Sequence, residues 1–239
     1  MRHKIRYRIP WAGMSQTSRI IAREVLATVA WGLLLPFGLT RSKRRTPRQK
    51  EQRTIVFVHG YVSNRASFLP LSLYLRGLGA KPILSFNYSS TLGVEQAAIE
   101  LKDFLKARVR GGRIDLICHS LGGVIARVYV QDLGGVRRVD RCITLGTPHK
   151  GTYNSYWVAS RIGRELRPDS DLIKRLFAER EKSGTVRYTS IVGESDNIII
   201  PRESAVSSSD TVSIPEVGHV GLLFSPTAFQ AIARRLLAD

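Results

Sequence analysis

The sequence has few residues of the kinds that cross-link small domains or bind metals. Only two of its 239 residues are cysteine, and it has no CxxC pair or His/Cys cluster, which excludes a disulfide framework and a structural zinc site. Cys118 and Cys142 both lie in apolar runs, which predicts buried thiols. It also lacks a nucleotide-binding loop, an internal repeat and a low-complexity segment, so we expect no organic cofactor.

Acidic residues are scarce as well. The chain has 19 Asp and Glu against 37 Lys and Arg, a formal net charge of +18. Residues 1–53 hold 13 of the basic and two of the acidic residues, so more than half of the excess lies there. We therefore predict a basic arm over residues 1–53 and a moderately basic domain over residues 54–239. Because no nucleic-acid-binding motif accompanies the charge, no nucleic-acid partner is expected.

The arm contains a long apolar run over about residues 20–39, interrupted near its start by Arg23 and Glu24. A bilayer requires about 20 apolar residues, so the run is of marginal length for spanning. Three interpretations are open: a retained membrane anchor that spans or lies in the interface, a cleaved signal peptide, or an apolar helix packed on the domain. The run is followed by arginines and not by a small-x-small cleavage site, which disfavours the signal peptide.

Basic residues flank this run on both sides, so the positive-inside rule assigns no orientation. They are Arg2, Lys4, Arg6, Arg8, Arg41, Lys43, Arg44 and Arg45. Their charge favours contact between residues 20–45 and an anionic membrane surface. We read residues 41–53 as a solvated linker, and expect a membrane-associated protein whose side of the membrane is open.

From residue 54 onward, strands alternate with helices. Short apolar runs predict strands over residues 54–60, 82–86, 114–118, 139–146, 186–193 and 211–214. Apolar residues at helical spacing predict helices over residues 68–78, 94–110, 121–133 and 228–237. This order predicts an α/β fold with a mostly parallel central sheet and helices on both faces. In such folds the functional groups lie beyond the carboxyl ends of the strands.

A serine stands just past the strand predicted over residues 114–118. The segment CHSLGG (118–123) places Ser120 between a strand and a helix, with small residues two positions away on either side. This spacing favours a sharp turn that exposes the serine Oγ and directs the N–H groups of the next helix toward a substrate. Cys118 stands where glycine is usual. A serine that only caps the helix is the alternative.

Two other strand ends offer the partners that a serine nucleophile requires. Asp196 follows the strand over residues 186–193 and can orient a histidine, with Glu194 as its nearest competitor. His219 lies on the loop after the strand over residues 211–214 and can reach the serine as general base.

A tetrahedral intermediate also needs preorganised N–H donors. We predict the backbone N–H groups of Leu121 and Tyr61, which follow Ser120 and the His59-Gly60 pair. His59 is expected to support its loop and not to act as base.

Ser120, Asp196 and His219 occur in the order of the α/β-hydrolase triad, and the chain resembles that superfamily, most closely its bacterial triacylglycerol lipase and esterase branch. The resembling motifs are HG at 59–60, HSLGG at 119–123, LGTPHKGT at 145–152, GESDNIIIP at 193–201 and GHVGLLFSP at 218–226. The resemblance covers residues 54–237 and implies an α/β-hydrolase fold, an ester hydrolase and a bacterial source. It also implies that Thr147, Pro148, His149 and Gly151 shape the wall beside the nucleophile.

Residues 153–182 are helical by pattern and lie where this superfamily commonly inserts a lid. We expect an apolar underside from Tyr153, Tyr156, Trp157, Val158 and Ile162, with an ordinary crossover helix pair as the alternative. Asp210 lies upstream of His219, where some lipases of this superfamily bind calcium, but no second carboxylate is placed to share an ion. We therefore expect no metal.

These residues predict a serine ester hydrolase, either a carboxylesterase or a lipase, that forms an acyl-enzyme on Ser120 with lipid-like or other acyl esters. The alternatives are a thioesterase, an amidase or an acyltransferase with the same triad, and a catalytically silent, membrane-associated binding module. The oligomeric state is open.

Overall fold

The computed structural model describes residues 15–39, 53–80, 82–208 and 210–237. The predicted linker over residues 41–53, apart from Arg53, and the basic residues at positions 2–8 and 41–45 lie outside the described residues. The division into an arm over residues 1–53 and a domain over residues 54–239 stays a prediction.

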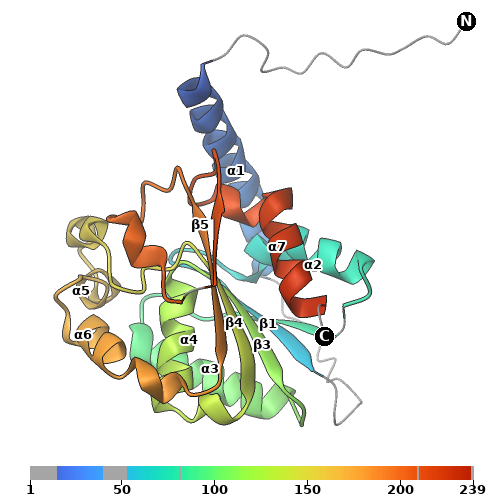
Figure 1. The fold of residues 1–239 in the computed structure, drawn as a ribbon, viewed down its shortest axis with the longest axis vertical. Coiled ribbons are helices and arrows are strands. Elements are labelled where there is room, and N and C mark those ends of the chain that lie inside the picture. Colours follow the sequence, from blue (N-terminus) through green and yellow to red (C-terminus); the bar gives the residue numbers. More distant parts are fainter. Residues whose placement is uncertain (1–14, 40–52, 81, 209, 238–239) are drawn as a thin grey trace, which may run out of the picture.

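The described strands form one parallel sheet in the order β2-β1-β3-β4-β5-β6 (Figure 1). They are β1 (Thr54–Val58), β2 (Ile83–Phe86), β3 (Ile114–His119), β4 (Val139–Leu145), β5 (Arg187–Gly193) and β6 (Thr211–Ile214). All six predicted strands are confirmed, with ends that differ by a residue or two. Because β1 ends at Val58, the His59-Gly60 pair lies just beyond its carboxyl end.

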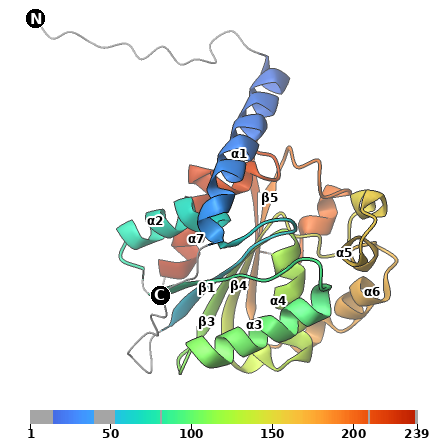
Figure 2. The ribbon, with the colours of Figure 1, turned by 180° about the vertical axis from the view of Figure 1, so that it is seen from behind.

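Helices cover both faces of the sheet, which confirms the predicted fold class (Figures 1 and 2). In the described part of the chain the α-helices are α1 (Gln16–Gly38), α2 (Leu69–Gly77), α3 (Val94–Arg108), α4 (Leu121–Asp132), α5 (Arg161–Glu165), α6 (Asp171–Ala178) and α7 (Pro226–Leu237). One buried apolar cluster joins the sheet to α3, α4 and α6, and a second joins it to α2 and α7. The two clusters make a three-layer core that holds the carboxyl ends of the strands in place.

The insertion predicted over residues 153–182 is a chain of short helices, namely the 3-10 helix η3 (Tyr153–Trp157), α5, α6 and the 3-10 helix η4 (Arg180–Ser183). The expected apolar underside is wrong for the aromatic residues: Tyr153 and Tyr156 are exposed, and Trp157 is 88% exposed. Ile162 alone of the large predicted residues is buried. The α6 side chains Leu172, Ile173 and Leu176 pack into the core, which matches the crossover alternative for that half.

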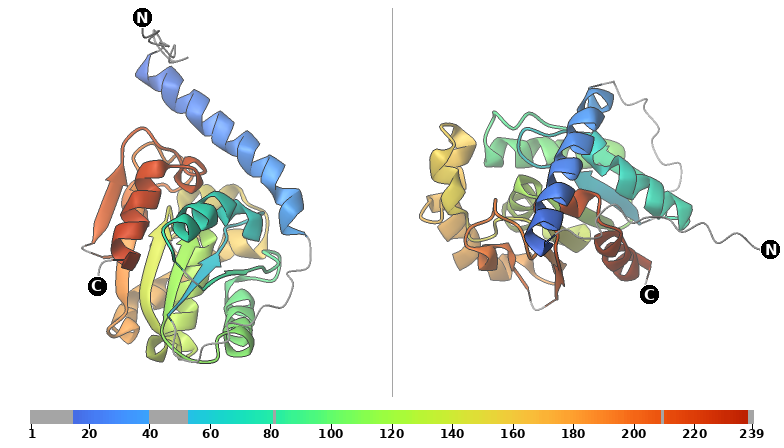
Figure 3. Two further views of the ribbon diagram at one scale, coloured as in Figure 1. Left: turned by 90° about the vertical axis from the view of Figure 1, so that its right-hand side faces the viewer. Right: turned by 90° about the horizontal axis from the view of Figure 1, so that it is seen from above.

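Helix α1 crosses the end of the molecule where the strands have their carboxyl ends (Figure 3). It is long and apolar enough to span a membrane by length and composition. However, its inner face packs on the domain: Ala27 is buried, and Trp31 joins the cluster under α2 and α7. Its outer face is an exposed apolar stripe of every fourth residue, Ile21, Val25, Val29, Leu33 and Phe37.

Candidate active site

Ser120 occupies a strained turn between β3 and α4. Its backbone has φ 53° and ψ −124°, a region that residues with a side chain rarely adopt. The Ser120 N–H donates to the Leu145 carbonyl at 2.9 Å, and the Ser120 carbonyl accepts from Thr147 Oγ1 at 2.9 Å and the Gly123 N–H at 3.1 Å. These bonds hold the turn, and they give Thr147 a definite task in the wall that the resemblance implied.

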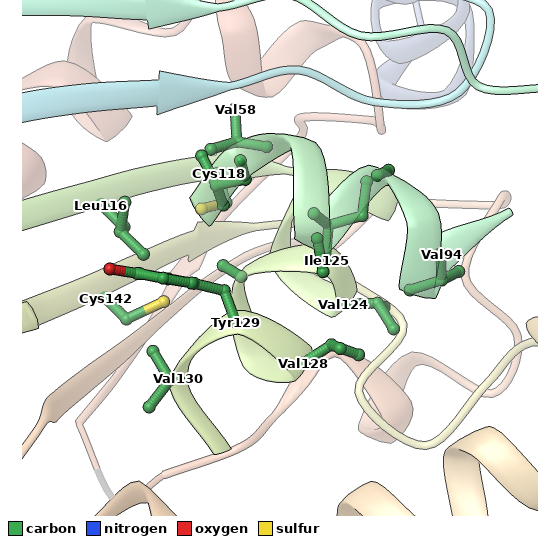
Figure 4. Close-up of a cluster of buried hydrophobic side chains, with 14 of the residues drawn as sticks. Val58, Val94, Leu116, Cys118, Val124, Ile125, Val128, Tyr129, Val130 and Cys142 are labelled. Carbon is green, nitrogen blue, oxygen red and sulfur yellow. The ribbon is translucent and has the colours of Figure 1, made fainter. Parts of the chain in front are cut away.

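The two small residues around Ser120 have different reasons to be small. A methyl group at Gly122 would lie 2.3 Å from the Val58 carbonyl oxygen, so only glycine lets α4 begin directly against the end of β1. The Cys118 side chain instead points into the apolar cluster beside Cys142, Leu116 and Val58 (Figure 4). Both thiols are fully buried, as predicted. Cys118 therefore fills core volume below the turn.

Asp196 and His219 come together as predicted from their strand ends. His219 Nδ1–H donates to Asp196 Oδ2 at 2.7 Å, which leaves the ring's Nε2 as the atom able to accept a proton. The other oxygen, Asp196 Oδ1, accepts from the N–H groups of Ile198 and Ile199 at 2.8 and 3.0 Å. Burial opposes ionisation of Asp196, but the His219 ring and these N–H groups outweigh it and lower the carboxyl pKa. The pair is thus built to hold a buried negative charge.

Two neighbours of the pair were not assigned this role from the sequence. The Nε2–H of His119 donates to the His219 carbonyl at 3.1 Å, so the residue before Ser120 holds the backbone of His219. Gly146 has φ +52°, and a methyl group there would lie 3.0 Å from Asp196 Oδ2 and from His219 Nδ1. The sequence feature that could have identified Gly146 is its position at the end of a predicted strand, in the LGTPHKGT motif.

Two of these contacts link Ser120 to the Asp196–His219 pair. The residue before Ser120, His119, is bonded to the His219 carbonyl, and the Ser120 N–H is bonded to Leu145, the residue before Gly146. Among the described residues, no hydrogen bond joins Ser120 Oγ to the His219 ring. In enzymes without substrate this contact is often long and shortens in the substrate complex.

The loop after β1 positions the first predicted oxyanion donor. His59 Nδ1–H donates to the Gly60 carbonyl at 3.0 Å, while His59 Nε2 accepts from the Tyr88 N–H at 3.4 Å. In a trans peptide the carbonyl and the next N–H point in opposite directions, so holding the Gly60 carbonyl also fixes the Tyr61 N–H. His59 therefore supports the loop, as expected.

The same loop lies against the nucleophile, because a methyl group at Gly60 would be 3.1 Å from Ser120 Cβ. Tyr61 N–H and Leu121 N–H donate to no protein group within the described part of the chain. Both are thus available to a ligand, and the Leu121 N–H lies at the positive end of α4.

The remaining described histidines are poor proton acceptors at neutral pH. Burial lowers the pKa of His59 to about 4 and that of His119 to about 3. Burial also lowers the pKa of His149, whose Nε2 contacts Thr144 Oγ1 at 3.0 Å. Since a general base works best with a pKa near the operating pH, these rings fit supporting roles.

The carboxylate considered for calcium is already engaged. Asp210 Oδ2 accepts from Thr189 Oγ1 at 2.5 Å and from Arg235 Nε at 2.7 Å, which lowers the pKa of Asp210. Its partners tie β5 to α7.

Comparison with known proteins supports the fold. A family model described as a domain of unknown function (DUF7379) matches residues 37–154, which include β1 to β4 and Ser120. The mature lipase BlEst2 of Bacillus licheniformis is 13% identical, with a TM-score of 0.63 over 84% of this chain and 96% of that chain. A thermophilic esterase of Thermogutta terrifontis is 15% identical, with a TM-score of 0.54 over 79% and 91%. A membrane phospholipase A, described as a bacterial virulence factor, is 14% identical, with a TM-score of 0.55 over 91% and 93%.

Proposed function

We propose that this chain, which has the α/β-hydrolase fold of bacterial lipases and esterases, is a serine ester hydrolase that forms an acyl-enzyme on Ser120. The observation that carries the proposal is the buried 2.7 Å contact between His219 and Asp196 beside a strained serine. A general base, its orienting carboxylate and the hydroxyl of a half-buried serine at one edge of a sheet are the groups that acyl transfer requires.

In the proposed reaction, His219 Nε2 takes the Ser120 Oγ proton as the oxygen attacks the acyl carbonyl. The N–H groups of Tyr61 and Leu121 stabilise the oxyanion, and Asp196 stabilises the imidazolium. His219 then returns the proton to the leaving alcohol, which leaves an ester on Ser120. A water molecule deprotonated by His219 attacks this ester, and collapse of the second intermediate releases the acid and restores Ser120.

The substrates we propose are lipid-like acyl esters at a membrane surface. Trp157 is 88% exposed on η3, and amphipathic aromatic side chains favour the membrane–water interface. The outer stripe of α1 exposes five large apolar side chains, among them Leu33 at 70% and Phe37 at 67%. A row of exposed apolar side chains on the predicted basic arm favours binding to an anionic lipid surface.

We infer that α1 lies in the interface and does not span the bilayer while it is docked. Trp31 Nε1–H donates to Ser63 and Ser67 Oγ at 3.2 and 3.1 Å, and Asn64 Nδ2–H donates to the Leu35 carbonyl at 2.8 Å. A helix held along one face by the domain presents only its outer stripe to lipid.

Hydrolysis of p-nitrophenyl butyrate by the full chain, wild type beside Ser120→Ala, tests the enzyme proposal. We expect activity in the wild type and background in the variant. Equal activity in both would show that Ser120 is not the nucleophile. Parallel rates with a thioester, an amide and an alcohol acceptor distinguish the thioesterase, amidase and acyltransferase alternatives. Inactivity of the wild type toward all of them favours a binding module.

Co-sedimentation with vesicles tests the surface proposal. The triple change Val25→Ser, Val29→Ser and Leu33→Ser is expected to lower binding to anionic vesicles at least about tenfold, because three apolar side chains no longer leave water. Thr28→Ser, on the same helix, is the matched control. Unchanged binding of the triple variant would contradict an interfacial α1.

A further inference from the structure

Helix α1 reaches the loop that carries His219. The Glu24 carboxylate accepts from the Val220 N–H at 2.6 Å through Oε1 and from the Gly221 N–H at 3.0 Å through Oε2. These N–H groups belong to the two residues directly after His219. Glu24 lies on the first half of α1, 196 residues away from Val220 in the chain.

The loop leaves space for this carboxylate. A methyl group at Gly218 would lie 2.5 Å from the Glu24 carboxylate, and one at Gly221 would lie 2.8 Å from Glu24 Oε2. Glycine therefore stands on both sides of the contact, just before His219 and two residues after it. Only hydrogen atoms at these positions let the carboxylate approach both N–H groups.

A second contact holds the other side of the loop. Glu216, which has φ 56°, pairs with Arg23 Nη1 at 2.8 Å and Arg19 Nη2 at 3.5 Å. His219 thus lies between two loop segments that α1 binds, one through an acid and one through bases. At its far end the same helix binds Ser63, Asn64 and Ser67, just beyond the predicted donor Tyr61.

We propose that Glu24 is a positioning residue of the acyl-transfer site, which holds the His219 backbone so that the ring meets Ser120. This inference rests on the proposed function. A carboxylate that accepts two backbone N–H groups forms charge-assisted hydrogen bonds, which are about twice as strong as neutral ones. The helix that faces the lipid is thereby joined to the base that performs the chemistry, and removal of α1 removes that support.

The test compares Glu24→Gln with Thr28→Ala in the full chain, with p-nitrophenyl butyrate as substrate. Thr28 Oγ1 donates to the Glu24 carbonyl of its own helix, and no hydrogen bond joins it to the domain among the described residues, so its loss serves as a control on helix α1. We expect Glu24→Gln to lower kcat about tenfold or more with KM within twofold, because the base is displaced but the acyl pocket is intact. Thr28→Ala is expected to leave both constants unchanged.

A double-mutant cycle between Gly221→Ala and Glu24→Ala distinguishes the proposed role of Glu24 from a folding defect. The added methyl displaces the Glu24 carboxylate, so Gly221→Ala is expected to lower kcat in the wild type but to add little in Glu24→Ala, with melting temperatures recorded for each. Independent, additive losses, or a Glu24→Gln kcat within twofold of wild type, would overturn the inference. If Ser120→Ala is inactive in that case, the proposed function stands and only the role of Glu24 fails; if Ser120→Ala stays active, the proposed function fails.

Discussion

Two buried aspartates at opposite ends of the same sheet behave differently. Asp196, beyond the carboxyl end of β5, is 4% exposed and accepts three short hydrogen bonds, from the His219 ring and two backbone N–H groups. Asp115, near the amino end of β3, is 1% exposed and meets Arg53 at 3.2 Å and Arg141 at 3.4 Å. The pKa of Asp196 is lowered, whereas burial raises that of Asp115 to about 6.

The difference shows what keeps a buried carboxylate charged. Short, directed N–H donors offset the loss of water around Asp196, while the arginines around Asp115 lie farther away and are shared with Asp140, which also repels it. Nearby charge alone is therefore insufficient. The carboxyl end of the sheet is preorganised to hold a carboxylate in its charged form, as the proposed reaction requires, and the amino end is a structural ion network.

The largest difference between the two aspartates is expected when each is exchanged for its neutral isostere, asparagine. Asp196→Asn is expected to lower kcat by about 10⁴, because the amide no longer holds the reactive tautomer of His219. Asp115→Asn is expected to leave kcat within twofold. Ester hydrolysis by both variants is the measurement, and a similar loss in the two would contradict a special role for the carboxyl end.

The backbone N–H of Tyr61 is the second feature of the carboxyl end that a substitution can test. Tyr61→Pro removes the N–H and is expected to lower kcat by about 10²–10³, the effect of losing one oxyanion donor. Tyr61→Phe keeps the N–H and loses only a 3.5 Å contact to Ser160, so its kcat should stay within twofold. Equal kcat values for the two variants, at matched melting temperatures, would remove Tyr61 from the site.

The raised pKa of Asp115 predicts a pH-dependent stability. Between about pH 4 and 6 the folded chain keeps this proton while the unfolded chain, with a pKa near 3.9, releases it. Stability from this group is therefore lost as pH rises through that window. The unfolding free energy of Asp115→Asn minus that of wild type should rise by about 2–3 kcal/mol between pH 4 and 7. A pH-independent difference in urea titrations would show that Asp115 titrates normally.

The smallest effect is expected on the outer edge of the amino-end network. Arg187 is exposed and contacts Asp140 at 2.6 Å, so Arg187→Ala should change the unfolding free energy by less than about 1 kcal/mol. Thermal unfolding measures this, and a larger loss would mean that the network stabilises the sheet as a unit.

Much of the fold was predictable because each strand is a short apolar run between turn residues. The candidate site was predictable for a related reason. Parallel strands bring their carboxyl ends to one edge, so residues just past separate strands, Ser120, Asp196 and His219, are expected to be neighbours. The positions of these residues relative to the predicted strands were therefore sufficient to predict that they lie together.

Contacts between distant segments left no such signal. Nothing local marks Glu24 as a partner of the loop after His219, since a charge inside an apolar run has many explanations. The aromatic residues of η3 face solvent because Tyr153 N–H donates to the Ile200 carbonyl and Asn154 Nδ2–H donates to the Asn197 carbonyl, which set the direction of the segment. Helical periodicity in the sequence therefore does not predict which side chains of this segment face the domain.

We propose that Ser120, at the carboxyl end of this sheet, is activated by His219 and Asp196. The most direct test is to treat the full chain with a fluorophosphonate, which traps activated serines, and to locate the adduct by peptide mass spectrometry. We expect one adduct, on the peptide that contains Ser120, formed far more slowly in Asp196→Asn than in Asp115→Asn. Labelling at another residue, or equal labelling of Ser120→Ala, would contradict it.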